Sequence, residues 1–413
     1  MKILTGGYLI DGTGRDPIPN AVVVIDDHGQ LVYTGKSKRD YPNAEVVDVS
    51  GRTIMPGLID CHVHFFIEIR SLQELALTPM SLRVIQATLN AKSTLDAGIT
   101  SVRDALGTPF GFKKAVEQGL IPSPRMRIAI TGLTQTGGHG DFHLPTGMRH
   151  PLVPFGDKWE WPEGICDGVE EVRKATRAVL RSGADFVKLM SSGGVMSPSD
   201  EPESPQFTQE EITVIVQEAK AAGKTAMAHA QSTQGIRNAV ECGVESIEHG
   251  FFLDEAIIVE MKKRGTFLVP TLQALKAAIS HAEKNPDSVM PQSIRKAKDA
   301  LEAHKNSFKM AVDSGVRIAM GTDAGVGEHG TNAEELSLMV ENGMTPMQAI
   351  VASTKTASEC IHLENDIGTL EAGKIADILV VDGNPLDDIT ILENTKNILM
   401  IIQGGNFYKD TIS

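Results

Sequence analysis

The sequence predicts an α/β fold: a (β/α)8 TIM-type barrel joined to a small β-sandwich that is built from both ends of the chain. Three observations support this prediction. Short apolar runs alternate with helical patterns through the middle of the chain, as in a series of strand–helix units. Both ends are instead rich in β-branched residues and turn signals. The length of 413 residues suffices for one large barrel domain and one smaller domain.

The two ends of the chain show the same strand-and-turn pattern. Ala21–Ile25 is a β-branched run, and an Asp-Asp-His-Gly turn signal follows it. Near the other end, residues 376–385 read as a strand that ends in a turn. We therefore expect residues 1–55 and 363–413 to form one composite β-sandwich domain, and residues 56–362 to form the barrel.

Eight apolar runs in the middle of the chain are the predicted strands of the barrel. In order they are Ile54–His62, Thr100–Asp104, Met126–Thr131, Phe186–Met190, Ala226–His229, Ser246–Glu248, Phe267–Pro270 and Ile318–Gly321. Helical patterns lie between them, at Val169–Ser182, Thr208–Ala222 and Ser293–Ser314. Thr208 is a good N-cap, because Glu211 stands at the third position of the helix. In such barrels the active site lies at the C-terminal ends of the strands.

The composition argues against several classes of protein. The net charge of −14 argues against a nucleic-acid partner, because phosphate binding needs a basic surface. No apolar run is long enough to span a membrane, and the N-terminus lacks the pattern of a secretory signal. The four cysteines are far apart and form no Cys-x-x-Cys pair, which fits free thiols in a reducing compartment. We therefore predict a cytoplasmic protein.

The first predicted strand leads into two histidines that are one residue apart, His62 and His64. Because side chains alternate faces along a strand, both imidazoles should project in the same direction. Two converging imidazoles suit a transition metal such as zinc. An isolated His-x-His pair is at least as often a pair of core or surface histidines, so the other strand ends must decide between the two interpretations.

Further strands end in residues that can bind metal ions. Lys188 lies in the fourth strand, His229 ends the fifth, His249 follows the sixth and Asp323 follows the eighth. Each has an ordinary explanation: a lysine paired with an acid, satisfied polar histidines, and an aspartate that caps a turn or helix. Their joint position at one end of one barrel favours a metal site. A buried lysine cation is costly, but carboxylation by carbon dioxide makes an anionic carbamate that could bridge two ions.

Taken together, these motifs resemble the amidohydrolase superfamily of metal-dependent hydrolases over nearly the whole chain. The motifs are PGLIDCHVHF, VKLMSSGGV, MAHA, ESIEHG, MGTDAG and the terminal ADILVVDGNPL. Within the superfamily the chain is most similar to the imidazolonepropionase-like and prolidase-like dipeptidase branch. Residues 134–141 and 192–198, after the third and fourth strands, support that branch.

The resemblance implies a site with two divalent metal ions, with Zn²⁺ as the expected metal. His62, His64 and Asp323 would hold the more buried ion, and His229 and His249 the more exposed one. N-carboxylated Lys188 would bridge the two ions together with a hydroxide. His139 would polarise the scissile carbonyl. Asp323 would take a proton from the attacking hydroxide and deliver it to the leaving amine. The resemblance also suggests a homo-oligomer.

The leading hypothesis is therefore a hydrolase that cleaves the amide bond of an Xaa-Pro-like dipeptide or an N-acyl amino acid. A second hypothesis keeps the site but changes the substrate to a cyclic amide, lactone, carbamate or N-acylated xenobiotic. A third is a barrel without catalytic activity, which the complete set of metal ligands disfavours. One departure bears on the choice: dipeptidase relatives usually have a tyrosine where this chain has Gln231, so the substrate can differ from an ordinary Xaa-Pro dipeptide.

A long loop follows the third predicted strand, from residue 137 to residue 168, and it contains both tryptophans. Loops of this length in a compact domain are usually functional or disordered, so we predict a lid or a pocket wall. Arg149 in this loop is a candidate ligand for a substrate carboxylate, because a guanidinium matches that geometry. A solvated surface arginine is the alternative interpretation of the same residue.

Overall fold

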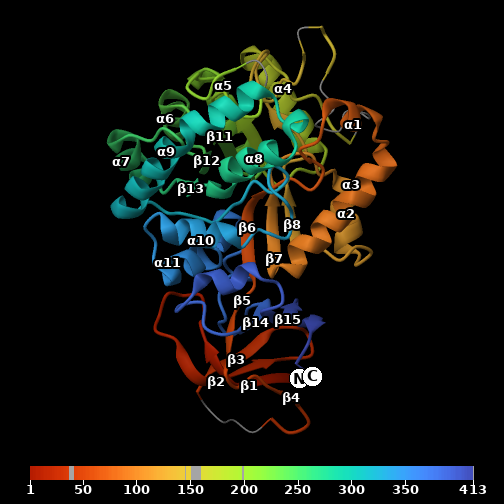
Figure 1. Cartoon of the computed structure of the whole chain (residues 1–413), viewed down its shortest axis with the longest axis vertical. Helices are drawn as coiled ribbons and strands as arrows, with labels where there is room; N and C mark the ends of the chain where they lie inside the picture. The colour runs from red at the N-terminus through yellow and green to blue at the C-terminus, as the bar shows by residue number, and fades with distance from the viewer. Residues whose placement is uncertain (37–40, 145, 150–159, 198–199, 413) are drawn as a thin grey trace.

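The computed structural model of the chain describes residues 1–36, 41–144, 146–149, 160–197 and 200–412 (Figure 1). The molecule is elongated: a sheet near the two termini occupies one end, and parallel strands surrounded by helices occupy the other. Both termini lie close together at the edge of the terminal sheet. Part of the predicted lid loop, including Trp159, lies outside the described residues.

The terminal sheet combines strands from both ends of the chain, as predicted. Its eight strands run in the order β16-β15-β14-β5-β1-β2-β3, with β4 paired to β1. Their bounds are β1 (Lys2–Leu9), β2 (Ile18–Ile25), β3 (Leu31–Gly35), β4 (Glu45–Asp48), β5 (Arg52–Pro56), β14 (Ile378–Asp382), β15 (Ile398–Gln403) and β16 (Asn406–Asp410). They form one sheet by hydrogen bonding rather than the two separate sheets of a sandwich. The predicted domain boundaries stay a prediction.

The described residues of the rest of the molecule form two parallel sheets. The first has three strands, β6 (Leu58–Val63), β7 (Ile99–Asp104) and β8 (Arg125–Ile128). The second has five, β9 (Gly132–Leu133), β10 (Val187–Met190), β11 (Ala226–Ala230), β12 (Ser246–His249) and β13 (Phe267–Val269). These strands are almost entirely buried, as expected where helices cover a parallel sheet. The mixed α/β fold with parallel strands is confirmed.

The structure corrects the predicted strands at three places. Ile54–His62 is two strands, because the chain leaves the terminal sheet at Gly57 and enters the parallel sheet there. A side chain at Gly57 would clash with Thr100, since its Cβ would lie 2.2 Å from Oγ1. The third predicted strand is divided into β8 and β9, with Ile130 between them in a left-handed conformation (φ 66°).

The eighth predicted strand, Ile318–Gly321, is a hydrogen-bonded segment rather than a regular strand. Ile318 forms an isolated parallel bridge with Leu268 of β13. On its other side the segment bonds to β6, because the N–H of Cys61 donates to the carbonyl of Met320 (2.9 Å). The segment therefore lies between the two parallel sheets, but its few ladder bonds do not make it a strand of either.

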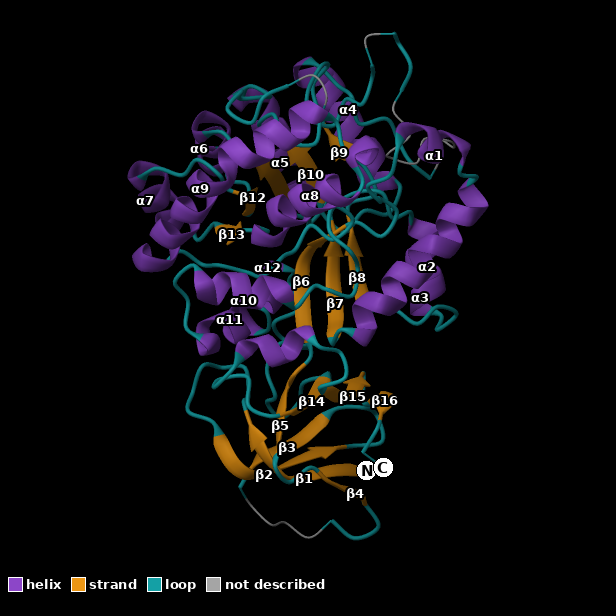
Figure 2. Cartoon of the chain, viewed as in Figure 1, coloured by secondary structure: helices purple, strands orange, loops and turns teal. Residues whose placement is uncertain are grey.

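Helices surround the parallel strands (Figure 2). The three predicted helices are confirmed as α4 (Gly168–Arg181), α5 (Gln209–Ala221) and α9 (Pro291–Ser314), and Thr208 and Glu211 form the expected capping box. The others are α1 (Leu72–Leu77), α2 (Met80–Asp96), α3 (Phe110–Glu117), α6 (Thr233–Glu241), α7 (Glu255–Arg264), α8 (Leu272–Lys284), α10 (Glu334–Glu341), α11 (Pro346–Ala352) and α12 (Lys355–Cys360). Within the described ranges, none has the length and apolarity that a bilayer crossing requires.

A surface pair gives a pH-dependent contribution to stability. His362 Nε2 and Glu245 Oε2 are 2.8 Å apart, and this bond raises the pKa of His362. Because the pKa of His362 is higher in the folded state, the ion pair stabilises the fold fully at pH values below the pKa of the unfolded state, about 6.5. This stabilisation is lost as the pH rises through the pKa of the folded state. His362→Asn, which tolerates the left-handed backbone at this position, should cost about 0.2–1 kcal/mol at low pH and nothing measurable at high pH. Urea unfolding at about pH 5.5 and about pH 8.5 measures both values, and equal losses at the two pH values would contradict the ion pair.

Candidate active site

One pocket brings together the side chains at the ends of the parallel strands. The predicted metal ligands come from different elements: β6 and the residue after it, β10, β11, β12 and the segment after the eighth predicted strand. All of them line this pocket, together with two further predicted site residues: His62, His64, Lys188, His229, His249, Asp323, His139 and Gln231. The C-terminal ends of the parallel strands therefore meet as the prediction required.

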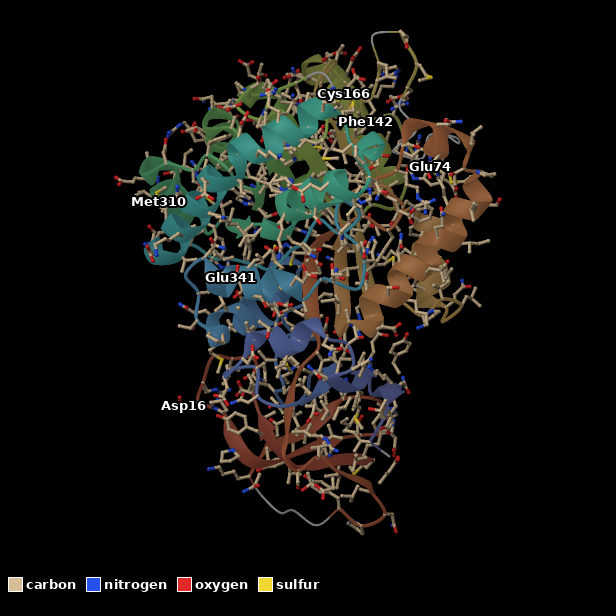
Figure 3. All side chains as sticks on the ribbon, viewed as in Figure 1. Asp16, Glu74, Phe142, Cys166, Met310 and Glu341 are labelled. Atoms are coloured by element: carbon tan, nitrogen blue, oxygen red, sulfur yellow. The ribbon has the colours of Figure 1, made fainter. Side chains whose placement is uncertain are left out.

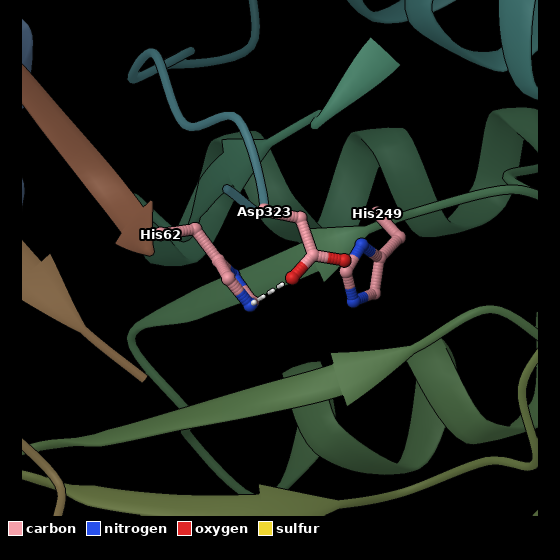
Figure 4. A group of neighbouring side chains, drawn as sticks. All are labelled: His62, His249 and Asp323. Carbon is pink, nitrogen blue, oxygen red and sulfur yellow. Dashed lines mark ion pairs between the residues drawn. The ribbon is translucent and has the colours of Figure 1, made fainter. Parts of the chain in front are cut away.

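Three of these side chains lie within metal-binding distance of one another (Figure 4). His62, at the end of β6, His249 and Asp323 each offer a ligand atom, and these atoms lie within 4.8 Å of one another. Oδ1 of Asp323 is 3.5 Å from Nε2 of His62 and 3.0 Å from Nε2 of His64. The ring of His229 lies 4.7 Å from that of His249, which extends the cluster toward β11. The arrangement has the nitrogen and oxygen donors that zinc accepts.

Each candidate histidine ligand has one ring nitrogen bonded to an oxygen of the surrounding protein. The pairs are His62 Nδ1 with Glu248 Oε2 (2.7 Å), His64 Nδ1 with the Leu106 carbonyl (3.1 Å), His249 Nδ1 with Thr271 Oγ1 (2.7 Å) and His229 Nε2 with the Gly193 carbonyl (3.0 Å). Carbonyl and carboxylate oxygens only accept, so at three of the four rings the bonded nitrogen has the proton. The opposite nitrogen then has a lone pair, which is how proteins prepare histidine for a metal.

Burial keeps three histidines of this cluster uncharged. It lowers the pKa values of His62, His229 and His249 well below the usual range, which favours the neutral, metal-binding imidazole. Burial also lowers the pKa of Lys188 to about 8. At His64 burial is the largest influence and acts in the same direction, but the bond to Asp323, the charges of Asp323 and Asp104 and the bond to the Leu106 carbonyl together raise the pKa. Lys188 itself makes no hydrogen bond or ion pair with any residue in the described part of the chain.

The backbone is held in an unusual conformation at two of the candidate ligands. His249 and Asp323 have φ values of 73° and 60°, in the left-handed region that non-glycine residues rarely adopt. Such strain clusters at functional sites and persists where neighbouring groups fix it. At Asp323 the fixing group is Asp60, whose carboxylate accepts bonds from the N–H (3.1 Å) and hydroxyl (2.7 Å) of Thr322 and from Asn332 (2.8 Å).

A buried ion pair below the pocket was not predicted from the sequence. Glu248 is fully buried and lies between His62 and Arg103, whose Nη2 is 2.9 Å from Oε1 of Glu248. Arg103 also donates to the hydroxyl of Ser246 and to the carbonyl of Cys61. The only sequence signal is position: Glu248 directly precedes His249 in the ESIEHG motif, and Arg103 lies within a buried strand.

The pocket wall beyond the candidate ligands is apolar. It is formed by Ile67, Ile69, Leu106, Phe142, Met190, Val195, Met196, Phe251, Ala274, Leu275, Ala278 and Val326. Phe142, labelled in Figure 3, and His139 belong to the predicted lid loop, so the described part of that loop does contribute a pocket wall. Among the described lining residues Lys188 is the only lysine and none is arginine.

The two predicted substrate contacts have different positions. Gln231 lines the pocket, is 4% exposed, and its Oε1 has no hydrogen-bond partner among the described residues. Arg149 is not among the lining residues, and its Nη2 is 3.0 Å from Oε1 of Glu163. The structure therefore gives Arg149 a protein partner outside the pocket, and its contact with a substrate carboxylate stays a prediction.

The fold and the pocket together define an amidohydrolase: residues 53–407 match the model of the Amidohydrolase family, and the chain belongs to that family. It is 34% identical to ochratoxinase of Aspergillus niger, in an alignment covering 99% of this chain and 87% of the relative. It is similar to the crystal structure of a prolidase complexed with N-methylphosphonate-L-proline (TM-score 0.91, 34% identity, 99% of both chains). It is also 24% identical to imidazolonepropionase of Geobacillus sp. (strain WCH70), over 88% of this chain and 84% of the relative. The predicted resemblance to this superfamily and branch is confirmed.

Proposed function

We propose that the protein is a binuclear metal-dependent hydrolase that cleaves an amide bond in an apolar N-acyl amino acid or a dipeptide. The observation on which this rests is that six ligand-type side chains line one pocket while each histidine among them is fixed from outside through its other nitrogen. The amidohydrolase family, with ochratoxinase and a prolidase among the similar proteins, supports hydrolysis of an amide.

The donor set fits two divalent ions. His62, His64 and Asp323 would hold one ion, and His229 and His249 the other. Lys188 would bridge them after its amine adds to carbon dioxide, which forms an N–C bond and releases one proton. The anionic carbamate would remove the cost of a buried cation that has no partner. When bound, the two ions supply a hydroxide at neutral pH and polarise the carbonyl oxygen. Zinc is the proposed metal, because imidazole and carboxylate ligands suit it.

The chain's own residues would then orient the substrate and move protons. Asp323 faces the pocket and would accept a proton from the nucleophile and deliver it to the leaving amine. His139 would contact the scissile carbonyl through its pocket-side nitrogen, and Gln231 would bond a polar group of the substrate. We also infer that the two parallel sheets, joined by residues 318–324, form the (β/α)8 barrel typical of similar proteins. The cytoplasmic location and homo-oligomeric state stay predictions.

The pocket wall favours apolar substrates over charged ones. Twelve apolar side chains face the pocket, and the described lining offers a substrate carboxylate no arginine. A dipeptide has an ammonium group as well as a carboxylate, whereas an N-acyl amino acid has only the carboxylate. Gln231 also stands where prolidase-like relatives usually have tyrosine, so we place an apolar N-acyl amino acid ahead of an Xaa-Pro dipeptide. A cyclic amide, lactone, carbamate or N-acylated xenobiotic would meet the same wall and is the second candidate class.

Metal analysis with a substrate panel tests this proposal. The purified protein should contain close to two ions per chain, and removal of the ions by a chelator should abolish hydrolysis until zinc is restored. In a panel of N-acyl amino acids, Xaa-Pro and Xaa-Arg dipeptides, lactones and carbamates, the apolar N-acyl amino acids should have kcat/KM values at least about 10-fold higher, since each methylene in an apolar pocket changes discrimination by 10-fold or more. Full activity in the chelated protein would contradict a metal mechanism, and a preference for Xaa-Pro would contradict only the ranking of N-acyl amino acids ahead of dipeptides.

A further inference from the structure

A group of buried polar side chains lies beside His139 and bonds to it. Nδ1 of His139 is 3.0 Å from Oγ of Ser197, which is fully buried. Ser197 in turn donates a short hydrogen bond to Oδ1 of Asp200, whose side chain is also buried. Asp200 is therefore linked to the imidazole through one hydroxyl group.

A second connection reaches His139 through its backbone. The N–H of His139 donates to Oε1 of Gln206 (2.9 Å), and Nε2 of Gln206 donates to Oδ2 of Asp200 (2.8 Å). Both carboxylate oxygens of Asp200 are thus used to hold one residue of the pocket wall. A buried carboxylate with this many partners is fixed in position and can fix its partners in turn.

The segment that contains Ser197 and Asp200 is anchored to α9. Lys296 of that helix is 2% exposed, and its Nζ donates to the carbonyls of Gly194 (3.1 Å), Ser197 (2.9 Å) and Asp200. The same segment approaches the pocket closely, because a Cβ on Gly194 would lie 2.3 Å from Cε1 of His139.

The direction of the hydrogen bonds assigns a proton to Nδ1 of His139. The single hydroxyl proton of Ser197 has two acceptors, Asp200 Oδ1 and the Gly194 carbonyl (3.2 Å). Neither acceptor can donate to Ser197, so the remaining neighbour, Nδ1 of His139, donates to Oγ. Nε2 is then the nitrogen left for the pocket, while the ring stacks on His229 at 4.0 Å.

We propose that Ser197 and Asp200 are positioning residues for amide hydrolysis: they act through His139 and hold its ring with Nδ1 protonated and Nε2 directed at the substrate. The order Asp–Ser–His differs from a hydrolase triad, because here the serine is buried behind the histidine and does not attack. The proposal rests on the proposed function for its kinetic consequences, but its structural consequence, the proton on Nδ1, does not depend on turnover.

Kinetics test the coupling to His139. Ser197→Ala and Asp200→Asn should each lower kcat by about 10- to 100-fold, the range typical of supporting partners, with KM and metal content nearly unchanged. In a His139→Asn background the same substitutions should cause no further loss, because they act only through the ring. Glu201→Gln is the matched control: it neighbours Asp200 but its exposed side chain pairs with Arg295, and it should keep wild-type kcat. Equal losses with and without His139 would overturn the proposal.

Histidine ring ¹⁵N NMR tests the geometry without any substrate. In the metal-loaded protein the His139 signal, assigned by its absence from His139→Asn, should show a protonated Nδ1, and Ser197→Ala should lose that preference. A wild-type ring protonated only at Nε2 would overturn the proposal even in an active enzyme. If the NMR signature is present but no amide is hydrolysed, the proposed function fails while the positioning of His139 stands.

Discussion

Replacing Lys188 with alanine should lower kcat/KM by on the order of 10³-fold and reduce the bound metal from two ions to about one per chain. Partners outside the metal shell typically cost 10- to 100-fold when removed, and a residue that bridges both ions should cost more. Lys188 lies on β10 and lines the pocket, is almost fully buried, and has no partner among the described residues. Steady-state kinetics and elemental analysis of the same preparation give the two values.

The control for this variant is Lys174→Ala, which removes an exposed lysine from helix α4 just before the same strand. It should keep wild-type activity and metal content. Short carboxylic acids added to Lys188→Ala should restore part of the activity, because a free carboxylate can occupy the place of the carbamate. Unchanged activity in Lys188→Ala would refute the bridging role, whatever the metal content.

Replacing Arg103 with leucine should lower the free energy of unfolding by about 3–5 kcal/mol, the usual cost of leaving one member of a buried ion pair without its partner. Glu248 is fully buried and receives bonds from Arg103 (2.9 Å) and Ser246 (2.6 Å). Without the guanidinium its charge is left in the protein interior, and its remaining hydrogen bonds are to the neutral His62 ring and the Ser246 hydroxyl. Urea unfolding of the metal-free protein isolates this effect from metal binding.

A double variant separates charge from packing. Arg103→Leu combined with Glu248→Leu removes both charges and should be more stable than Arg103→Leu alone, since the desolvation cost of Glu248 is also removed. Arg295→Ala, which breaks exposed pairs with Glu201 and Asp299, should change stability by less than about 1 kcal/mol. If Arg103→Leu were as mild as Arg295→Ala, the buried pair would contribute little to the fold.

The residues of the pocket could be predicted because their signals are local. The alternation of side chains along a strand places His62 and His64 on the same face. His229 and His249 could be placed because the C-terminal ends of parallel strands lie at the same edge of the sheet. Asp323 follows a segment that is not a regular strand. Its position directly after an apolar run still predicted that it would lie at the pocket. The same rule did not place Arg149, which lies in a loop where no repeating geometry relates sequence position to a place in space.

The supporting groups could not be predicted because they depend on contacts between distant segments. Glu248 points to His62 and Arg103 from another sheet, and nothing around it in sequence indicates either partner. Lys296 reads as one charge on a long amphipathic helix, yet its ammonium holds a loop about a hundred positions earlier (102 residues to Gly194). The division of the first predicted strand at Gly57 likewise depends on the close approach of Thr100.

The pairing of β5 with β14 has a consequence for how the molecule is assembled. Thr53 of β5 donates to the carbonyl of Gly383, 330 positions along the chain, and the N–H of Gly57, just before β6, donates to the carbonyl of Asp377. Because β6 leads directly to His62, the terminal sheet can help to hold the pocket's first strand only after residues beyond 376 have left the ribosome. Pairing between strands that are this far apart in sequence is slow to form. A nascent chain should therefore complete this part of its ligand geometry after the contacts of β6 with β7, which are closer in sequence.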